Sequence, residues 1–259
     1  MTTGTLQAYI EKFNLCGEGT WEGEIPLPAG ASSYGIAIKS DGAPNGTEVW
    51  VTDFFAPKVY VYNFGTCNNP PNCVETITLP AGWHTAAPGH IAFAYPGLGI
   101  GSYRAYVTDR ASDNRRALVI TGPPGSRSVN EITWDPLHSN SQLSFMYTWG
   151  IAVDPSSQIA YLTWPASEGN QLLFKINIAA NDAPSYFSIA PLNLNGGRGV
   201  AWLADGSRAY IGSNTNRFLS IINRDGTPAG TTSTLAGVPY WVATSYLLYN
   251  FSQGPSRRR

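Results

Sequence analysis

The stretch that decides the fold is Val49-Trp50-Val51-Thr52-Asp53, because it returns as Ala105-Tyr106-Val107-Thr108-Asp109. Weaker copies read Ala-Tyr-Leu-Thr-Trp at 160–164 and Ala-Tyr-Ile-Gly-Ser at 209–213. Each copy is rich in β-branched and aromatic residues and is typical of a short strand. Recurrence of one strand pattern along the chain indicates a repeat architecture.

A second set of strands precedes these copies. Its members combine small and β-branched residues after a turn, and they lie at 34–38, 89–93, 149–153, 198–202 and 240–244. Third strands are predicted at 58–62, 117–120, 172–176 and 218–222, and 75–79 is an example of a fourth. Turn pairs such as Asp205-Gly206 and Asp154-Pro155 separate the first strand of a unit from the second, as expected for hairpins.

Four short antiparallel strands that repeat every 42 to 60 residues predict an all-β chain folded as a β-propeller. Five inner strands imply five four-stranded blades. The N-terminal segment reads as the outer part of a blade, since Ile-Pro-Leu-Pro-Ala-Gly at 25–30 nearly repeats 77–82. We therefore expect the ring to close by pairing of these N-terminal strands with the inner strand at 240–244, in one domain over residues 1–252 with a flexible tail at 253–259.

The phrases Tyr-Gly-Ile-Ala at 34–37, Val-Trp-Val-Thr-Asp at 49–53 and Lys-Val-Tyr-Val-Tyr-Asn at 58–63 resemble propellers of the NHL and YVTN type. More narrowly, they resemble the virginiamycin B lyase-like and gluconolactonase-like groups. In the lyase-like proteins a histidine often stands beside the glycine that begins the inner strand. There, histidine and acidic side chains at the channel mouth bind metal and abstract a proton, and His90 occupies a related place here.

Composition excludes several classes of function. Charged residues make up 13% of the 259 residues, and the 16 basic side chains are nearly balanced by 17 acidic ones. Nucleic-acid binding relies on clustered cations, so no nucleic-acid partner is expected. Apolar runs are short, so no membrane-spanning helix or membrane partner is expected. The arginines between 104 and 127 read as parts of solvated loops.

Cys67 and Cys73 bracket a loop with two prolines, so a short-range disulfide is plausible and Cys16 would be the odd thiol. A disulfide, together with the glycosylation sequons at 45–47 and 250–252, favours a secreted or extracytoplasmic protein over a cytoplasmic one. Secretion would require a leader that this sequence does not show. The alternative is three reduced cysteines in a cytosolic protein.

Side chains at the starts of the inner strands are expected to converge at one mouth of the central channel. Those residues are Tyr34, Gly89 or His90, Trp149, Arg198, and Tyr240 or Trp241. The ends of the second strands add Asp53 and Asp109, and the loop at 81–89 adds Trp83 and His84. These positions differ from blade to blade, which favours a single asymmetric pocket over repeated sites.

The leading hypothesis is an enzyme that acts on a small apolar or aromatic molecule by general acid–base chemistry, in a lyase, cyclase or lactone-opening step. His90 is the candidate base, Arg198 stabilises negative charge, and Asp109 or Asp53 orients the imidazole. Tyr34, Trp83, His84, Trp149, Tyr240 and Trp241 form the walls. A packing role remains the alternative for the aromatic residues, as do loop-holding hydrogen bonds for the two aspartates.

No motif identifies a cofactor, so either none is required or an unidentified divalent metal takes part. The rival hypothesis is a binding protein, either a lectin or a peptide-binding scaffold, because low charge and many Trp and Tyr also suit sugar recognition. The sequence leaves the oligomeric state open.

Overall fold

The chain forms antiparallel sheets that follow one another in sequence. The computed structural model describes residues 9–14, 20–39, 48–63, 74–82, 84–96, 102–111, 114, 116–134, 148–164, 172–192, 194, 196–213, 215–239 and 242. Within these ranges one sheet has two strands and four sheets have four. We call them blades one to five in chain order. This arrangement confirms the predicted β-propeller.

The strand bounds are close to those predicted. Blade one contains β1 (Tyr9–Asn14) and β2 (Thr20–Pro26). Blade two contains β3 (Ser33–Lys39), β4 (Glu48–Asp53), β5 (Lys58–Asn63) and β6 (Val74–Thr78). Blade three contains β7 (Pro88–Ala94), β8 (Arg104–Asp109), β9 (Arg116–Thr121) and β10 (Ser128–Thr133).

The remaining blades have the same order. Blade four contains β11 (Ile151–Val153), β12 (Ile159–Thr163), β13 (Leu172–Asn177) and β14 (Ala183–Ser188). A 3₁₀ turn, η4 (Ala190–Leu192), leads into blade five, which contains β15 (Gly197–Trp202), β16 (Arg208–Ser213), β17 (Ser220–Asn223) and β18 (Pro228–Thr231). In the described part of the chain no helix has the length and apolar character needed to cross a membrane.

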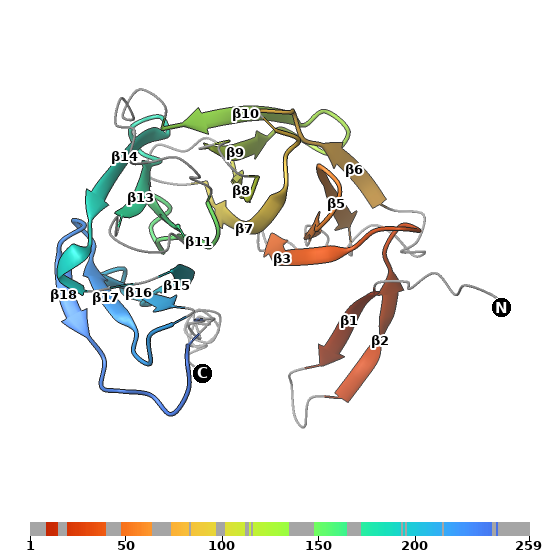
Figure 1. Cartoon of the computed structure of the whole chain (residues 1–259). Helices are drawn as coiled ribbons and strands as arrows, with labels where there is room; N and C mark the ends of the chain where they lie inside the picture. Colours follow the sequence, from red (N-terminus) through yellow and green to blue (C-terminus); the bar gives the residue numbers. More distant parts are fainter. Residues whose placement is uncertain are drawn as a thin grey trace, which may run out of the picture.

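The blades surround a common centre. In Figure 1 the first strands of blades two to five, β3, β7, β11 and β15, lie innermost, and their fourth strands lie at the perimeter. Strands within each of these blades pair in sequence order, so the chain runs from the centre outward and then crosses to the next blade. All four inner strands therefore start at the same end of the channel.

The hydrophobic core lies between the faces of neighbouring blades. Trp50 is fully buried between blades two and three, where its ring meets Phe93 edge to face at 5.3 Å. Trp134 and Phe174 pack together between blades three and four. Aromatic rings of this size bury large apolar areas, so packing between blades holds the ring together.

A threonine relay connects consecutive blades at the channel mouth. The hydroxyls of Thr52, Thr108 and Thr163 donate to the main-chain carbonyl oxygens of Gly89, Trp149 and Arg198, at 2.6, 2.7 and 2.5 Å. The same hydroxyls accept bonds from the amides of Gly35, His90 and Gly150 in their own blades. The repeated threonine therefore fixes the start of two inner strands at once.

Blade five departs from this relay. Gly212 stands where the preceding blades have threonine, and a Cβ added there would collide with the carbonyl oxygen of Pro239. Val242 also lies against Gly212. The chain after β18 thus returns to the second strand of blade five, which agrees with the direction expected for ring closure.

Closure itself stays a prediction. Residues 240, 241, 243 and 244 lie outside the described residues, as do the domain boundary at 252 and the tail at 253–259. Cys16, Cys67 and Cys73 lie outside them as well, so the disulfide is untested.

The expectation that the arginines between 104 and 127 belong to solvated loops is wrong. Arg116 is 1% exposed and pairs with Asp109 at 2.8 Å. Arg127 stacks on Trp50 and pairs with Glu48 at 2.7 Å, and Arg104 pairs with Asp182 at 2.6 Å. Arg116 meets a carboxylate of its own blade, whereas only the ring brings carboxylates from neighbouring blades beside Arg104 and Arg127.

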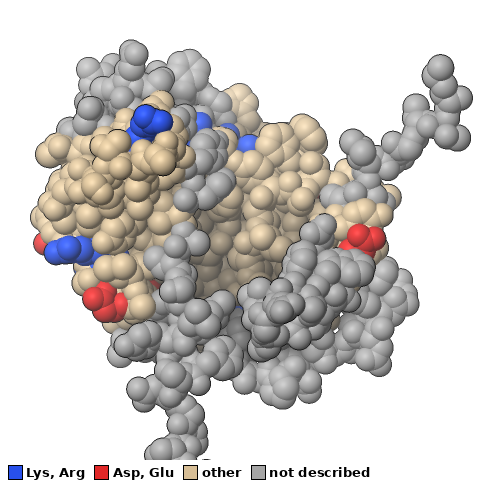
Figure 2. Space-filling view, turned by 90° about the horizontal axis from the view of Figure 1, so that it is seen from below, with Lys and Arg blue, Asp and Glu red and all other residues tan. Residues whose placement is uncertain are grey.

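The surface carries few charges. In the space-filling view of Figure 2, the non-grey surface is mostly uncharged, with isolated Lys, Arg, Asp and Glu side chains. The few charged residues are therefore dispersed and form no broad basic or acidic field on this face.

Candidate functional site at the channel mouth

Four of the predicted mouth residues come together, one from each of blades two to five. Tyr34 lies on β3, His90 on β7, Trp149 just before β11 and Arg198 on β15. The Tyr34 ring lies 5.1 Å from the His90 ring and 5.8 Å from the Trp149 ring, measured between centroids. The four residues are half-buried and form a continuous set, which we call the mouth cluster.

Arg198 lies across the face of an aromatic ring. Its guanidinium carbon is 4.0 Å from the centroid of the Trp149 ring. A planar guanidinium stacks well on an indole, and such a contact contributes about 0.5–2 kcal/mol. Stacking on the indole fixes the plane in which the N–H groups of the guanidinium point.

The sequence did not single out Arg110, although it joins the mouth cluster. Its guanidinium carbon lies 4.1 Å from the Tyr34 ring, 4.5 Å from the Phe54 ring and 5.6 Å from the Trp149 ring. Its Nη2 and Nε donate to the carbonyl oxygens of Phe54 and Pro88, at 3.2 and 3.3 Å. The mouth therefore contains two guanidinium groups, both near the ring of Trp149.

The path of Arg110 requires a glycine. A Cβ on Gly89 would lie 3.1 Å from Cγ of Arg110 and closer still to the hydroxyl of Thr108. Gly89 thus lets the arginine cross the strand. A signal for Arg110 does exist in the sequence, because it follows Asp109 as Phe54 follows Asp53, and Phe54 also contacts Tyr34.

His90 is held in its neutral form. Burial lowers the pKa of its imidazole from the ordinary 6.5 to about 4, and the positive charge of Arg110 contributes in the same direction. An imidazole with this pKa is unprotonated at neutral pH, so it can accept a proton or a hydrogen bond.

The two predicted aspartates hold loops. Asp53 is 2% exposed and accepts bonds from the amides of Phe55 and Ala56 and from the Tyr60 hydroxyl. Asp109 is fully buried and accepts bonds from Arg116, Asn114 and the amides of Ala87 and Ala111. These bonds match the loop-holding alternative, and none of them involves His90.

Of the other predicted wall residues, the structure describes only His84. His84 is exposed, and its main-chain amide donates to the Asn114 side chain at 2.8 Å. Trp83, Tyr240 and Trp241 lie outside the described residues. Among the described residues no group of three or more His, Cys, Asp or Glu side chains is placed to hold a metal ion.

The mouth cluster therefore offers an uncharged imidazole, two stacked guanidinium groups and aromatic walls. This combination can bind a small molecule with a flat or ring-shaped body. It can also stabilise negative charge that the molecule carries or develops.

No family model matches this chain, and no curated protein matches it in sequence. Solved structures do match in fold. A periplasmic gluconolactonase of Pseudomonas aeruginosa is 13% identical with a TM-score of 0.62, over 88% of this chain and 63% of that one. A Lactobacillus plantarum protein is 14% identical with a TM-score of 0.62, over 91% and 67%.

A candidate 6-phosphogluconolactonase of Bacteroides uniformis is 14% identical with a TM-score of 0.58, over 92% of this chain and 67% of that chain. This chain thus spans about two thirds of the length of the structures that it resembles. At such low identity the likeness concerns architecture. The chain shares its β-propeller fold with gluconolactonase-type structures.

Proposed function

We propose that the channel mouth is the active site of a hydrolase that opens a lactone ring. The observation that carries this proposal is the mouth cluster, in which an imidazole kept neutral lies beside two guanidinium groups. Lactone hydrolysis needs a group that takes a proton from water and a group that stabilises the oxyanion of the tetrahedral intermediate. The gluconolactonase among the structures of like fold supports the lactone-opening step over the lyase and cyclase alternatives.

His90 is the proposed base. Its pKa of about 4 makes it a weak base, yet it is fully available at neutral pH because Arg110 and burial keep it unprotonated. A lactone carbonyl is more reactive than an amide, so a weak base that positions one water molecule is adequate. The reaction then takes a proton from water onto the imidazole as the water oxygen bonds to the carbonyl carbon.

Arg198 is the proposed oxyanion partner, and Trp149 holds its guanidinium in one plane. Arg110 and Tyr34 form the opposite wall. When the ring opens, the leaving alkoxide takes the proton back from the imidazolium, and the new carboxylic acid loses its own proton to solvent. The carboxylate product remains beside the two cations. Asp53 and Asp109 receive no step in this proposal, because their oxygens hold loops.

The test is hydrolysis of a panel of γ- and δ-lactones, with and without an anionic substituent, followed by acid release at constant pH. We expect His90→Ala to lower turnover by about 10²–10⁴-fold and Arg198→Ala to lower it by a similar factor. Arg198→Lys should not restore full activity, because a point charge does not reproduce the planar fork. Trp149→Ala should raise KM through lost stacking.

Arg208→Ala is the matched control, since Arg208 is exposed on β16. It should leave turnover unchanged. Full activity of a stable His90→Ala protein would overturn the proposed base, and absence of hydrolysis across the whole panel would overturn the lactonase proposal.

A further inference from the structure

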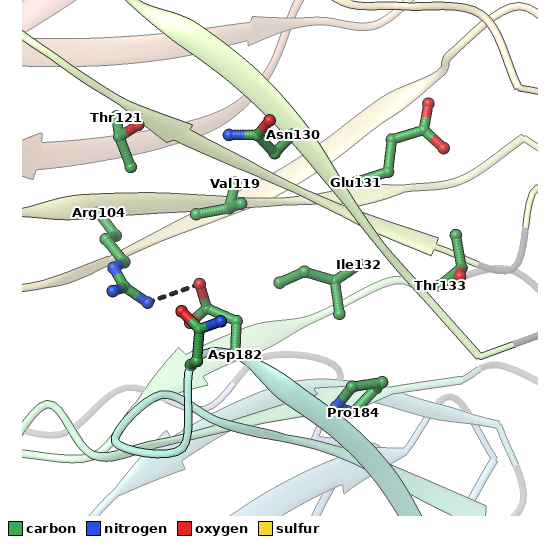
Figure 3. Close-up of a pocket in the computed structure, with 10 residues that line it drawn as sticks. Arg104, Val119, Thr121, Asn130, Glu131, Ile132, Thr133, Asp182 and Pro184 are labelled. Atoms are coloured by element: carbon green, nitrogen blue, oxygen red, sulfur yellow. Dashed lines mark hydrogen bonds and ion pairs between the residues drawn. The ribbon is translucent and has the colours of Figure 1, made fainter.

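A second cavity lies away from the channel, in a groove between blades three and four. Its volume is about 510 Å³, within the range of small-molecule sites. Strands β8, β9 and β10 form one wall, and the turn between β13 and β14 with the start of β14 forms the other (Figure 3). We call it the interblade groove. None of the mouth-cluster residues lines it.

The floor of the groove is a fixed polar pair. Nη1 of Arg104 lies 2.6 Å from Oδ2 of Asp182, and the hydroxyl of the buried Tyr106 donates to Oδ1 of the same carboxylate at 2.6 Å. Figure 3 shows the Arg104 head directed at Asp182 across the groove. Two partners orient this carboxylate, so its remaining lone pairs have set directions.

The turn that carries Asp182 has an unusual backbone. Asn181 and Asp182 both have positive φ angles, 57° and 61°. Asn and Asp tolerate this left-handed conformation better than other residues with a side chain, although two in succession are uncommon. The turn brings the carboxylate of Asp182 to Arg104 and places the Asn181 amide at the rim of the same groove.

The walls add neutral hydrogen-bonding groups. Asn130 on β10 and Asn181 have exposed amide side chains, and the described structure gives neither of them a hydrogen-bond partner. The hydroxyls of Thr121 and Thr133 lie along β9 and β10. Between these polar groups Ile132, which shares a strand face with Asn130, supplies an apolar surface.

The charges of the groove balance one another. Asp182 neutralises Arg104, and Glu131 is held by Arg116 on the other face of β10. A free anion or cation therefore finds no unpaired charge of opposite sign. Amides, hydroxyls and an oriented Arg–Asp pair instead match a ligand with several adjacent hydroxyl groups, each of which donates and accepts.

We propose that the interblade groove binds a neutral saccharide. This site is independent of the lactone-opening mouth, because its residues come from the outer strands of blade three and the outer hairpin of blade four. It gives structural support to the sugar recognition that the sequence leaves open as a rival function, but at a different place on the molecule.

The experiment titrates the full chain with neutral sugars, namely glucose, galactose, mannose, N-acetylglucosamine and lactose, by calorimetry and ligand-observed NMR. We expect at least one of them to bind with a Kd of about 10 mM or tighter. Asn130→Ala should weaken that sugar at least about fivefold, and Asn130→Asp should weaken it as well by removing the amide donors and adding a charge.

Thr76→Ala is the matched control, because Thr76 is an exposed polar residue on β6, the outer strand of the neighbouring blade. It should leave sugar binding unchanged, and so should Arg198→Ala. No binding by any of the five sugars, or binding that Asn130→Ala leaves intact, overturns the groove proposal without touching the lactonase proposal. Sugar binding that is lost in Arg198→Ala also overturns it, since the ligand then sits in the mouth.

Discussion

Arg116 and Arg110 lie in the same blade but in opposite kinds of surroundings. The guanidinium of Arg116 is buried, and it bonds to Asp109, Glu131 and the carbonyl of Pro80. The guanidinium of Arg110 stacks on aromatic rings and bonds to carbonyl oxygens. Carboxylates surround the first guanidinium, whereas aromatic rings and carbonyl oxygens of the mouth contact the second. One arginine holds the blade together and the other shapes the site.

The largest expected effect is on the buried arginine. Arg116→Leu leaves Asp109 fully buried without its cationic partner, so the free energy of unfolding should fall by roughly 3–5 kcal/mol. Denaturant titration measures this change. The double variant Arg116→Leu with Asp109→Asn should regain part of the loss, because no buried charge is then left unpaired. An unchanged stability in Arg116→Leu would mean that the pair does not hold the loop.

The next effect concerns pH. Folded His90 has a pKa of about 4 against an ordinary 6.5, so between these values the unfolded chain binds more protons than the folded chain. This contribution to stability is complete above about pH 6.5 and is lost as the pH falls toward 4. It amounts to roughly 3 kcal/mol, and His90→Gln should remove it from the pH dependence of unfolding. His84→Gln, which replaces an exposed histidine, is the matched control.

A smaller effect tests the stacked arginine directly. Arg110→Met keeps much of the apolar contact but removes the charge, so turnover of a lactone should fall by about 10- to 100-fold while unfolding changes by less than about 2 kcal/mol. The pKa of His90 should rise in this variant, because Arg110 lowers it. NMR titration of the imidazole measures the shift. If the pKa of His90 were the same in Arg110→Met as in the unmodified protein, Arg110 would not act on the imidazole.

The smallest effect concerns the threonine that positions Arg198. Thr163→Val removes the hydroxyl that joins the Arg198 carbonyl to the Gly150 amide, which should cost about 1–2 kcal/mol of stability. The bond also fixes the main chain at Arg198, near the start of β15, so KM for a lactone should rise too. Thr52→Val breaks the equivalent bond to Gly89 and should cost similar stability, with no change at Arg198. Equal KM values in the two variants would contradict this positioning role.

The strand repeat was enough to predict the architecture, because the same alternation of small, aromatic and β-branched residues recurs in the blades. It also placed Tyr34, His90, Trp149 and Arg198 at one end of the channel. The ion-pair partners of the arginines could not be predicted from the sequence, since Arg127 meets Glu48 and Arg104 meets Asp182 only across blade boundaries. Arg110 was missed, although its place after Asp109, equivalent to that of Phe54 after Asp53, was a usable signal.

The two aspartates illustrate the same limit. Asp53 and Asp109 end equivalent strands, and their repetition suggested a shared place near the mouth. A repeated residue can equally serve the loop of its own blade, and the hydrogen bonds of the two aspartates are of that kind. Residues that vary at equivalent positions therefore point to the site more reliably than residues that repeat.

The threonine relay has a further consequence for how such a site can change. Each threonine recognises a main-chain carbonyl, so its bond does not depend on the side chain of the residue that it anchors, and tryptophan and arginine occupy the anchored position in Trp149 and Arg198. Mutation can exchange the chemistry there while the backbone stays fixed. Libraries randomised at Trp149 and Arg198 should therefore yield many folded proteins, whereas Gly89 must stay glycine because a Cβ there would collide with the Thr108 hydroxyl. The channel mouth is thus a natural starting point for evolving new substrate specificities.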